Sequence, residues 1–215
     1  MRTALAVIAL ILSPSLAAAE DTTPVAEIIK EKCALCHGAE GEASSAIYPR
    51  IAGQNRVYLA KQLKNFRDGT RVSDTMNAMA DDLTDEQIAG LAEHFSSQAP
   101  LAHRIRRSKK PLAGVGEFIF RYGNEYTEIP PCTSCHGENG EGDENLPRLA
   151  GQHQNYVISQ LEAFHERKRT NDNAIMHTIA KNLTMLEMDA VALYVSGLRP
   201  AGNETVSDKE EPTND

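Results

Sequence analysis

The sequence contains no tryptophan, and phenylalanine and tyrosine together make up only 5% of its 215 residues. Aromatic side chains bury large apolar areas, so their scarcity leaves little material for a hydrophobic core. Small domains with a thin core often depend on a metal, disulfide bonds or a cofactor. We therefore expect such a group or link to stabilise this chain.

Long apolar runs are also scarce. The longest extends from Ala4 to Leu12, between Arg2 and the small residues Ala17 to Ala19. It is shorter than the roughly 20 residues that span a membrane, and its pattern is typical of a secretory signal peptide. We predict a signal peptide over 1–19 and, for a Gram-negative source, a periplasmic protein. The net charge of −8 argues against a nucleic-acid partner.

No stretch alternates apolar and polar residues over the length of a strand, so no sheet is expected. Instead, the chain contains an internal repeat. The matched blocks are CALCHG (33–38) with CTSCHG (132–137), PRIAGQ (49–54) with PRLAGQ (147–152), YLAKQLKNF (58–66) with YVISQLEAF (156–164), and LTDEQIAGLAEHFS (83–96) with LTMLEMDAVALYVS (183–196). Their preserved order indicates two tandem copies of one domain.

Each copy has the pattern of an all-helical domain. Apolar residues recur at helical spacing in the third pair of blocks. The last block of each copy begins with a capping-box pattern, Thr84 with Gln87 and Thr184 with Glu187. A further helix is expected before each cysteine motif, over 25–32 and 115–122.

The predicted domains cover 20–98 and 114–199, with a linker at 99–113 and an acidic, disordered tail at 200–215. The linker has no acidic residue, and its cations are Arg104, Arg106, Arg107, Lys109 and Lys110. Two interpretations remain open. The linker is either a docking site for an acidic partner or a segment that lies across the protein's own acidic faces.

All four cysteines, Cys33, Cys36, Cys132 and Cys135, belong to the two C-x-x-C-H motifs. Disulfides, zinc and a redox dithiol are alternatives. Zinc lacks a second Cys/His pair at suitable spacing, and a dithiol leaves the following histidine unexplained. Covalent haem accounts for every residue, because the thiols add to the porphyrin vinyl groups and the histidine binds iron. We therefore predict two haem c groups with proximal ligands His37 and His136.

Other recurring residues are expected around the haem groups. A ligating histidine usually has its second ring nitrogen hydrogen-bonded, and the backbone carbonyls of Pro49 and Pro147 are candidate acceptors. Three further pairs recur, namely Tyr58 and Tyr156, Gln62 and Gln160, and Arg50 and Arg148. These side chains either contact haem propionates or hold the domain together, and the sequence does not decide between the two.

The sixth iron ligand separates a carrier from an enzyme, since an open position admits oxygen or peroxide. Counted from the last block, Met76 pairs with Met176, whereas Met79 pairs with Ile179. We predict Met76 and Met176 as the axial ligands and Met79 as core filler. This pairing depends on an insertion before the methionine, because the preceding block pairs Met76 with Ala174.

Histidine ligation at the sixth position is the alternative. The five histidines outside the C-x-x-C-H motifs do not recur, so we expect surface or packing roles for them. They are His94, His103, His153, His165 and His177.

The two CxxCHG motifs, the PR[IL]AGQ blocks, the YxxxQL helices and the methionine before Leu-Thr resemble the cytochrome c4 family. The resemblance covers about residues 24–199. It implies two class I cytochrome c domains in an electron carrier, not an enzyme, that takes no small-molecule substrate. Such proteins are periplasmic, sometimes membrane-associated, and pass electrons from a quinol-oxidising complex to terminal oxidases. The alternatives are the electron-accepting subunit of a sulfur-compound-oxidising dehydrogenase and a dihaem peroxidase, which would lack one sixth ligand.

Overall fold

The computed structural model of the chain describes residues 24–199. Its regular secondary structure in that range is helical, apart from one isolated bridge between Asn124 and Ile129. This confirms the all-helical prediction for the described part of the chain. No helix between residues 24 and 199 has the length and apolarity to cross a membrane. The predicted signal peptide and acidic tail lie outside the described residues.

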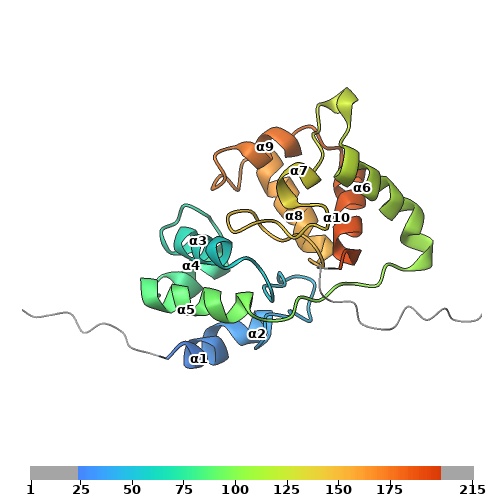
Figure 1. Cartoon of the computed structure of the whole chain (residues 1–215). Helices are drawn as coiled ribbons and strands as arrows, with labels where there is room; N and C mark the ends of the chain where they lie inside the picture. The colour runs from blue at the N-terminus through green and yellow to red at the C-terminus, as the bar shows by residue number, and fades with distance from the viewer. Residues whose placement is uncertain (1–23, 200–215) are drawn as a thin grey trace, which may run out of the picture.

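Two halves of similar construction follow one another along the chain (Figure 1). The helices of the first half are α1 (Val25–Ile28), η1 (Ile29–Cys33, a π-helical turn), α2 (Ala34–His37), α3 (Arg56–Arg67), α4 (Asp74–Ala80) and α5 (Asp85–Ser96). Those of the second half are η2 (Arg107–Lys109), α6 (Lys110–Tyr122), η3 (Glu125–Thr127), α7 (Thr133–His136), α8 (Gln154–His165), α9 (Ile175–Ala180) and α10 (Met185–Gly197).

Each half has its own hydrophobic core, built on its last helix. The predicted helical stripes are buried, and they comprise Ile88, Leu91, Ala92 and Phe95 on α5, and Met188, Val191, Ala192 and Val195 on α10. Both predicted capping boxes are present, so the side chains at the start of α5 and α10 satisfy backbone N–H groups that have no partner inside the helix.

Helix α6 begins at Lys110, five residues before the expected start, so residues 110–113 of the predicted linker are helical. Pro111 does not prevent this, because proline fits the first turn of a helix, where its missing N–H has no partner to lose. The helix packs closely on α10. A Cβ atom on Gly116 would lie 2.0 Å from the carbonyl oxygen of Ala190, so this crossing requires glycine.

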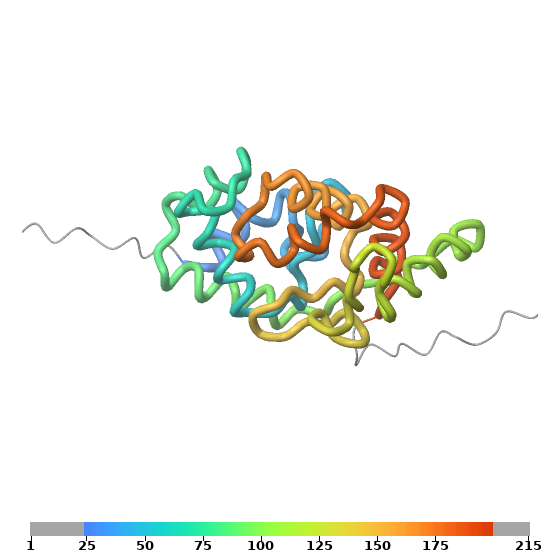
Figure 2. The backbone as a smooth tube through the Cα atoms, turned by 90° about the horizontal axis from the view of Figure 1, so that it is seen from above, coloured from blue at the N-terminus to red at the C-terminus, as the bar shows by residue number. Residues whose placement is uncertain are grey.

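The segment before the first cysteine motif also differs from expectation. A single helix was predicted over 25–32, but the α-helix ends at Ile28 and a π-helical turn leads to Cys33. Such turns are uncommon and often occur at functional sites. Viewed from above, the two halves lie side by side and the start of α6 projects from the body (Figure 2).

Candidate haem-binding sites

The two C-x-x-C-H motifs form one short helix each, α2 and α7, and both end on a buried histidine. His37 is 8% exposed and His136 is 7% exposed. The chain then turns through a glycine with a positive φ, +78° at Gly38 and +80° at Gly137. This left-handed backbone conformation favours glycine as the residue after the histidine in both motifs.

Both histidines have the hydrogen bond predicted from the sequence. The Nδ1 atom of His37 lies 2.9 Å from the carbonyl oxygen of Pro49, and that of His136 lies 3.1 Å from the oxygen of Pro147. A carbonyl can only accept, so Nδ1 carries the proton and Nε2 keeps a lone pair. Burial lowers the pKa of both imidazoles, which favours the same neutral form. Each ring is therefore prepared to bind a metal through Nε2.

The four cysteines are free thiols. Burial raises the pKa of Cys33 and Cys132 to about 11, so these two thiols are protonated at neutral pH. Both pack against the hydrophobic core of their own half, whereas Cys135 is exposed. Each motif thus places two free thiols on about one helical turn, which suits attachment to the two vinyl groups of one porphyrin.

Met76 and Met176 occupy equivalent positions in the two halves. Each lies in the first turn of its helix, and its backbone N–H donates to a side-chain oxygen just before that helix, at 3.3 Å from Ser73 Oγ and 2.6 Å from Asp172 Oδ2. Each also packs against the core of its own half, as the first cysteine of the motif does.

The residues that follow these methionines are equivalent too. The Asn77 side-chain amide donates to the carbonyl of Phe66, and His177 Nδ1 lies 2.9 Å from the carbonyl oxygen of Phe164. Phe66 and Phe164 occupy matching positions in the repeat. The geometry therefore supports the pairing of Met76 with Met176.

The insertion that shifts the repeat lies before α9. Asn173 and Ala174 both have left-handed backbone conformations, with φ of +56° and +65°, and they have no counterpart before α4. Met79 differs from its partner Ile179, because Met79 is 40% exposed while Ile179 packs against the core. The prediction that Met79 is core filler is therefore wrong. Ala80, the next residue, occupies the buried face of α4 instead.

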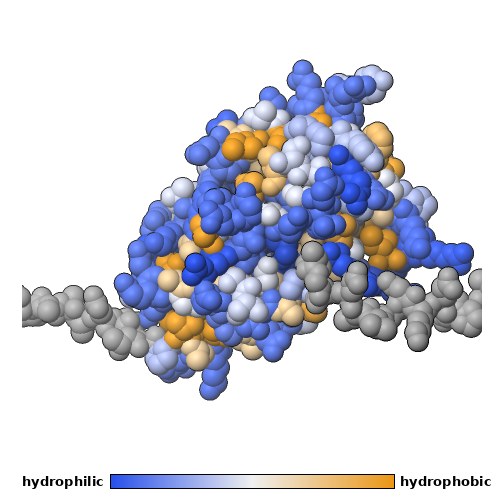
Figure 3. All heavy atoms as spheres, viewed as in Figure 1, coloured by the Kyte–Doolittle hydropathy of each residue, from blue (hydrophilic) through white to orange (hydrophobic). Residues whose placement is uncertain are grey.

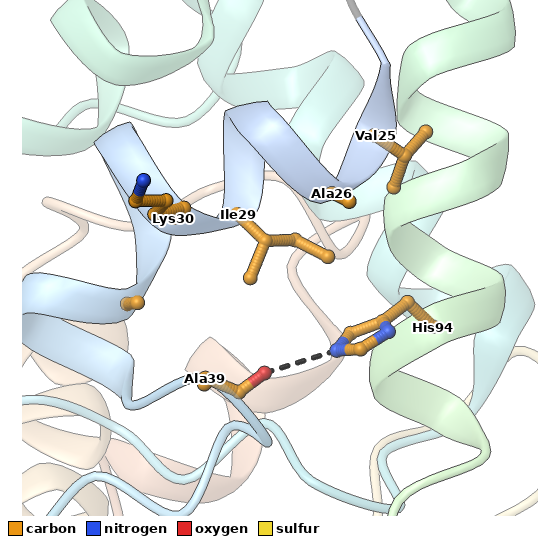
Figure 4. A pocket seen from close by; sticks show the side chains of 7 residues that line it. Val25, Ala26, Ile29, Lys30, Ala39 and His94 are labelled. Carbon is orange, nitrogen blue, oxygen red and sulfur yellow. Dashed lines mark hydrogen bonds between the residues drawn. The ribbon is translucent and has the colours of Figure 1, made fainter.

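The five other histidines all have hydrogen-bonding partners. His94 Nε2 lies 3.0 Å from the carbonyl oxygen of Ala39, in an open pocket between α1 and α5 (Figure 4). The pocket is lined mainly by apolar side chains, and neither His37 nor Met76 is among them. His103 and His153 are joined by a 2.8 Å hydrogen bond. His165 and His177 bond to backbone carbonyls.

The PR[IL]AGQ blocks of the two halves bind each other reciprocally. The side-chain amide of Gln152 pairs with the backbone N–H and carbonyl of Arg50, at 2.9 and 2.8 Å. Gln54 pairs in the same way with Arg148, at 2.7 and 3.0 Å. The guanidinium groups cross as well, since Arg50 donates to the carbonyl of Gly151 and Arg148 to that of Gly53. The blocks therefore join the halves about a local two-fold axis.

A second reciprocal cluster lies between α3 and α8. Arg71 donates to Tyr156 at 3.0 Å and to Gln160 at 2.7 Å, both in the other half. Arg169 donates to Tyr58 at 2.8 Å and to Gln62 at 3.2 Å in return. We call Arg71, Arg169 and these four partners the arginine cluster. Tyr58, Tyr156, Gln62 and Gln160 thus contact the opposite half.

Sequence reasoning missed the two arginines at the centre of this cluster. The signal was present, because FRDGTR (66–71) and FHERKR (164–169) share a phenylalanine and an arginine at the same spacing. Each guanidinium also lies over that phenylalanine, 4.6 Å from the ring centroid.

The charges at this interface fit an anionic cofactor. Arg71, Arg148 and Arg169 are 4–8% exposed, yet neither they nor Arg50 form an ion pair with any carboxylate between residues 24 and 199. Burial, followed by repulsion from Arg50, lowers the pKa of Arg148 to about 10.

Burial opposes ionisation of Tyr156, but Arg71 and Arg169 lower its pKa overall. Buried cations are normally compensated by anions. The propionate groups of haem would supply that compensation here, so the residues present fit the group.

Comparison with protein families matches residues 127–199 to the family described as "Cytochrome c" and residues 20–95 to "Cytochrome C oxidase, cbb3-type, subunit III". Cytochrome c4 of Azotobacter vinelandii is 37% identical over 179 residues, which cover 77% of this chain and 84% of that protein.

The crystal structure of reduced recombinant cytochrome c4 from Pseudomonas stutzeri superposes with a TM-score of 0.75 at 35% identity, over 81% of this chain and 98% of that one. The thiosulfate dehydrogenase electron acceptor of Thiomonas intermedia is 36% identical over 167 residues, 76% of this chain and 77% of that protein. The similarity extends through both halves: the chain belongs to the cytochrome c4 family of electron-transfer proteins, with two covalently bound haem c groups.

Proposed function

We propose that this protein is a periplasmic electron shuttle in which both irons have a closed coordination sphere. His37 and Met76 ligate one iron, and His136 and Met176 the other, with Cys33, Cys36, Cys132 and Cys135 attaching the porphyrins. A histidine and a methionine leave no position for oxygen or peroxide, so the metal exchanges electrons only. The observation that carries the proposal is the repetition of one arrangement in both halves: a buried histidine bonded to a proline carbonyl, and a methionine in the first turn of a short helix that packs on the core.

Binding of carbon monoxide to the reduced holoprotein tests this closed coordination. We expect the absorption spectrum of the reduced holoprotein to stay unchanged when carbon monoxide is added, because neither iron has an open coordination position. Formation of a carbonyl complex at one of the haem groups would instead support the peroxidase alternative and contradict the proposal.

The donor and acceptor form the second part of the proposal. Electron transfer from a quinol-oxidising complex to a terminal oxidase is the first candidate, and it allows peripheral association with the membrane. The relative named as a thiosulfate dehydrogenase electron acceptor supports the second candidate, acceptance of electrons from a sulfur-compound-oxidising enzyme.

Stopped-flow reduction distinguishes these two donors. The oxidised holoprotein is mixed either with a cytochrome bc1 complex and ubiquinol or with thiosulfate dehydrogenase and thiosulfate. The physiological donor reduces both haem groups at a rate that saturates with its concentration. Slow reduction by both systems, without saturation, would refute both pairings and leave the closed coordination untouched.

A further inference from the structure

The basic segment, which we define as residues 104–110, is an exposed run of five cations on this acidic chain. Arg104, Arg106, Arg107, Lys109 and Lys110 are all exposed. None of them forms an ion pair with another described residue, although eight such pairs occur elsewhere between residues 24 and 199. No aspartate or glutamate stands between Glu93 and Glu117 in the sequence. The segment therefore does not pair with the described acidic faces.

Stability of the fold does not account for this arrangement. Lys109 and Lys110 stand at the N-terminal end of α6, where the helix dipole is positive and cations are unfavourable. The first turn of α6 has no acidic residue, and its N-cap has no side-chain hydrogen bond.

The chain nevertheless holds the basic segment in place. The backbone N–H of His103 donates to the carbonyl of Ser196 at 2.9 Å. Ile105 packs closely against Gly197, because a Cβ atom added to this glycine would lie 2.4 Å from the Cδ1 atom of Ile105.

An exposed apolar stripe continues from the basic segment along α6. Val115, Phe118 and Tyr122 recur at helical spacing and are 47%, 60% and 67% exposed. The rings of Phe118 and Tyr122 lie 5.4 Å apart. Hydrophobic side chains gather over α6 at the right-hand side of Figure 3, beside hydrophilic surface. Charged surface beside exposed aromatic residues is the composition of a protein-binding face.

The stripe ends near the second cysteine motif. Arg121, beside Tyr122, bonds to Glu138 at 3.4 Å, and Glu138 lies two residues after His136. Helix α6 has 13 residues and is therefore about 20 Å long, so the cations lie roughly that far from this end. A molecule that follows α6 thus contacts the cations at one end and reaches the haem-attachment segment of the second half at the other.

We propose that the basic segment and the apolar stripe of α6 form the docking surface for an acidic face of a redox partner protein. The whole chain carries −8, so the residues outside the basic segment carry −13. An acidic partner is repelled by the rest of the molecule and attracted only here, which orients the encounter. A compact acidic face meets this segment alone, whereas an extended anionic membrane also faces the acidic remainder. This proposal rests on the proposed function only in taking the partner to be a redox protein.

Binding of a deca-glutamate peptide to the reduced holoprotein tests the surface without electron transfer. In amide NMR spectra at low ionic strength, we expect shifts at residues 103–122. The variant R104E/R106E/R107E weakens binding at least about tenfold. The matched control K30E/K61E/K181E changes the net charge equally at three exposed sites, and its affinity stays within about twofold of wild type. Equal weakening in both variants overturns the proposal.

Two further measurements exclude other occupants of the docking surface. Phosphatidylglycerol vesicles that bind through the basic segment while the peptide does not would assign the segment to the membrane. If a chain that ends at Arg199 binds the peptide and the full chain does not, residues 200–215 of the chain itself would be the occupant of the basic segment. Either outcome overturns docking of an external protein, while the closed coordination tested by carbon monoxide is unaffected.

Discussion

Replacement of Arg71 by methionine tests whether an anion compensates the arginine cluster. Methionine keeps an apolar stem of similar length, so the change removes the guanidinium without a large cavity. The guanidinium makes three hydrogen bonds, to Gln62, Tyr156 and Gln160 at 2.7, 3.0 and 2.7 Å. Hydrogen bonds to a charged group contribute about 1.5 kcal/mol or more each, so we expect the three to give a loss of at least about 4.5 kcal/mol in unfolding free energy.

The size of this loss depends on whether the haem carboxylates compensate the Arg71 charge. If no anion faced Arg71, removal of a buried charge would recover its desolvation cost of several kcal/mol and leave the stability nearly unchanged. We expect urea unfolding of the holoprotein, followed by circular dichroism, to show the full loss for both Arg71→Met and Arg169→Met. Arg56→Met is the control, since its ion pair with Glu93 is 65% exposed on both sides and contributes about 0–1 kcal/mol. A near-neutral Arg71→Met would refute the compensated cluster.

Two further predictions concern the helix caps and the histidine pair. Thr84→Ala and Thr184→Ala each remove one capping box, so we expect each to lower the unfolding free energy by about 1 kcal/mol in urea titrations. A difference of more than about twofold between the two losses would contradict the equivalence of α5 and α10. Burial, with repulsion from Arg50 and His153, lowers the pKa of His103 from 6.5 to about 4. Between pH 4 and 6.5, this histidine is therefore protonated in the unfolded chain and neutral in the folded one. Stability therefore falls as the pH drops from 6.5 towards 4, and His103→Gln flattens part of this dependence in thermal unfolding; an unchanged profile would count against it.

Features encoded by local pattern were predictable from the sequence. The capping boxes, the buried stripes of α5 and α10 and the bond from each histidine to a proline carbonyl depend on residues close in the chain, and the repeat displayed each of them twice. The pairing of Met76 with Met176 came from the same repeat. Local spacing alone did not give the exposure of Met79, because an apolar residue can lie on either face of a short helix.

The interface between the halves could not be predicted from the sequence, for a different reason. Gln54 and Gln152 were visible in the repeated blocks, but their partners lie about a hundred residues away. A repeat reports what each copy contains and not how two copies pack. Reciprocal contacts such as those of Arg71 and Arg169 follow from the arrangement of the halves, so they appear only in the structure.

The far-red charge-transfer band of the oxidised holoprotein tests the axial ligands most directly, because it arises from methionine sulfur bound to ferric haem. Wild type, Met76→Ala, Met176→Ala and Met79→Ala are compared at equal haem content. We expect Met76→Ala and Met176→Ala each to remove about half of the band and Met79→Ala to leave it intact. Loss of half the band in Met79→Ala, with Met76→Ala unchanged, would contradict this expectation.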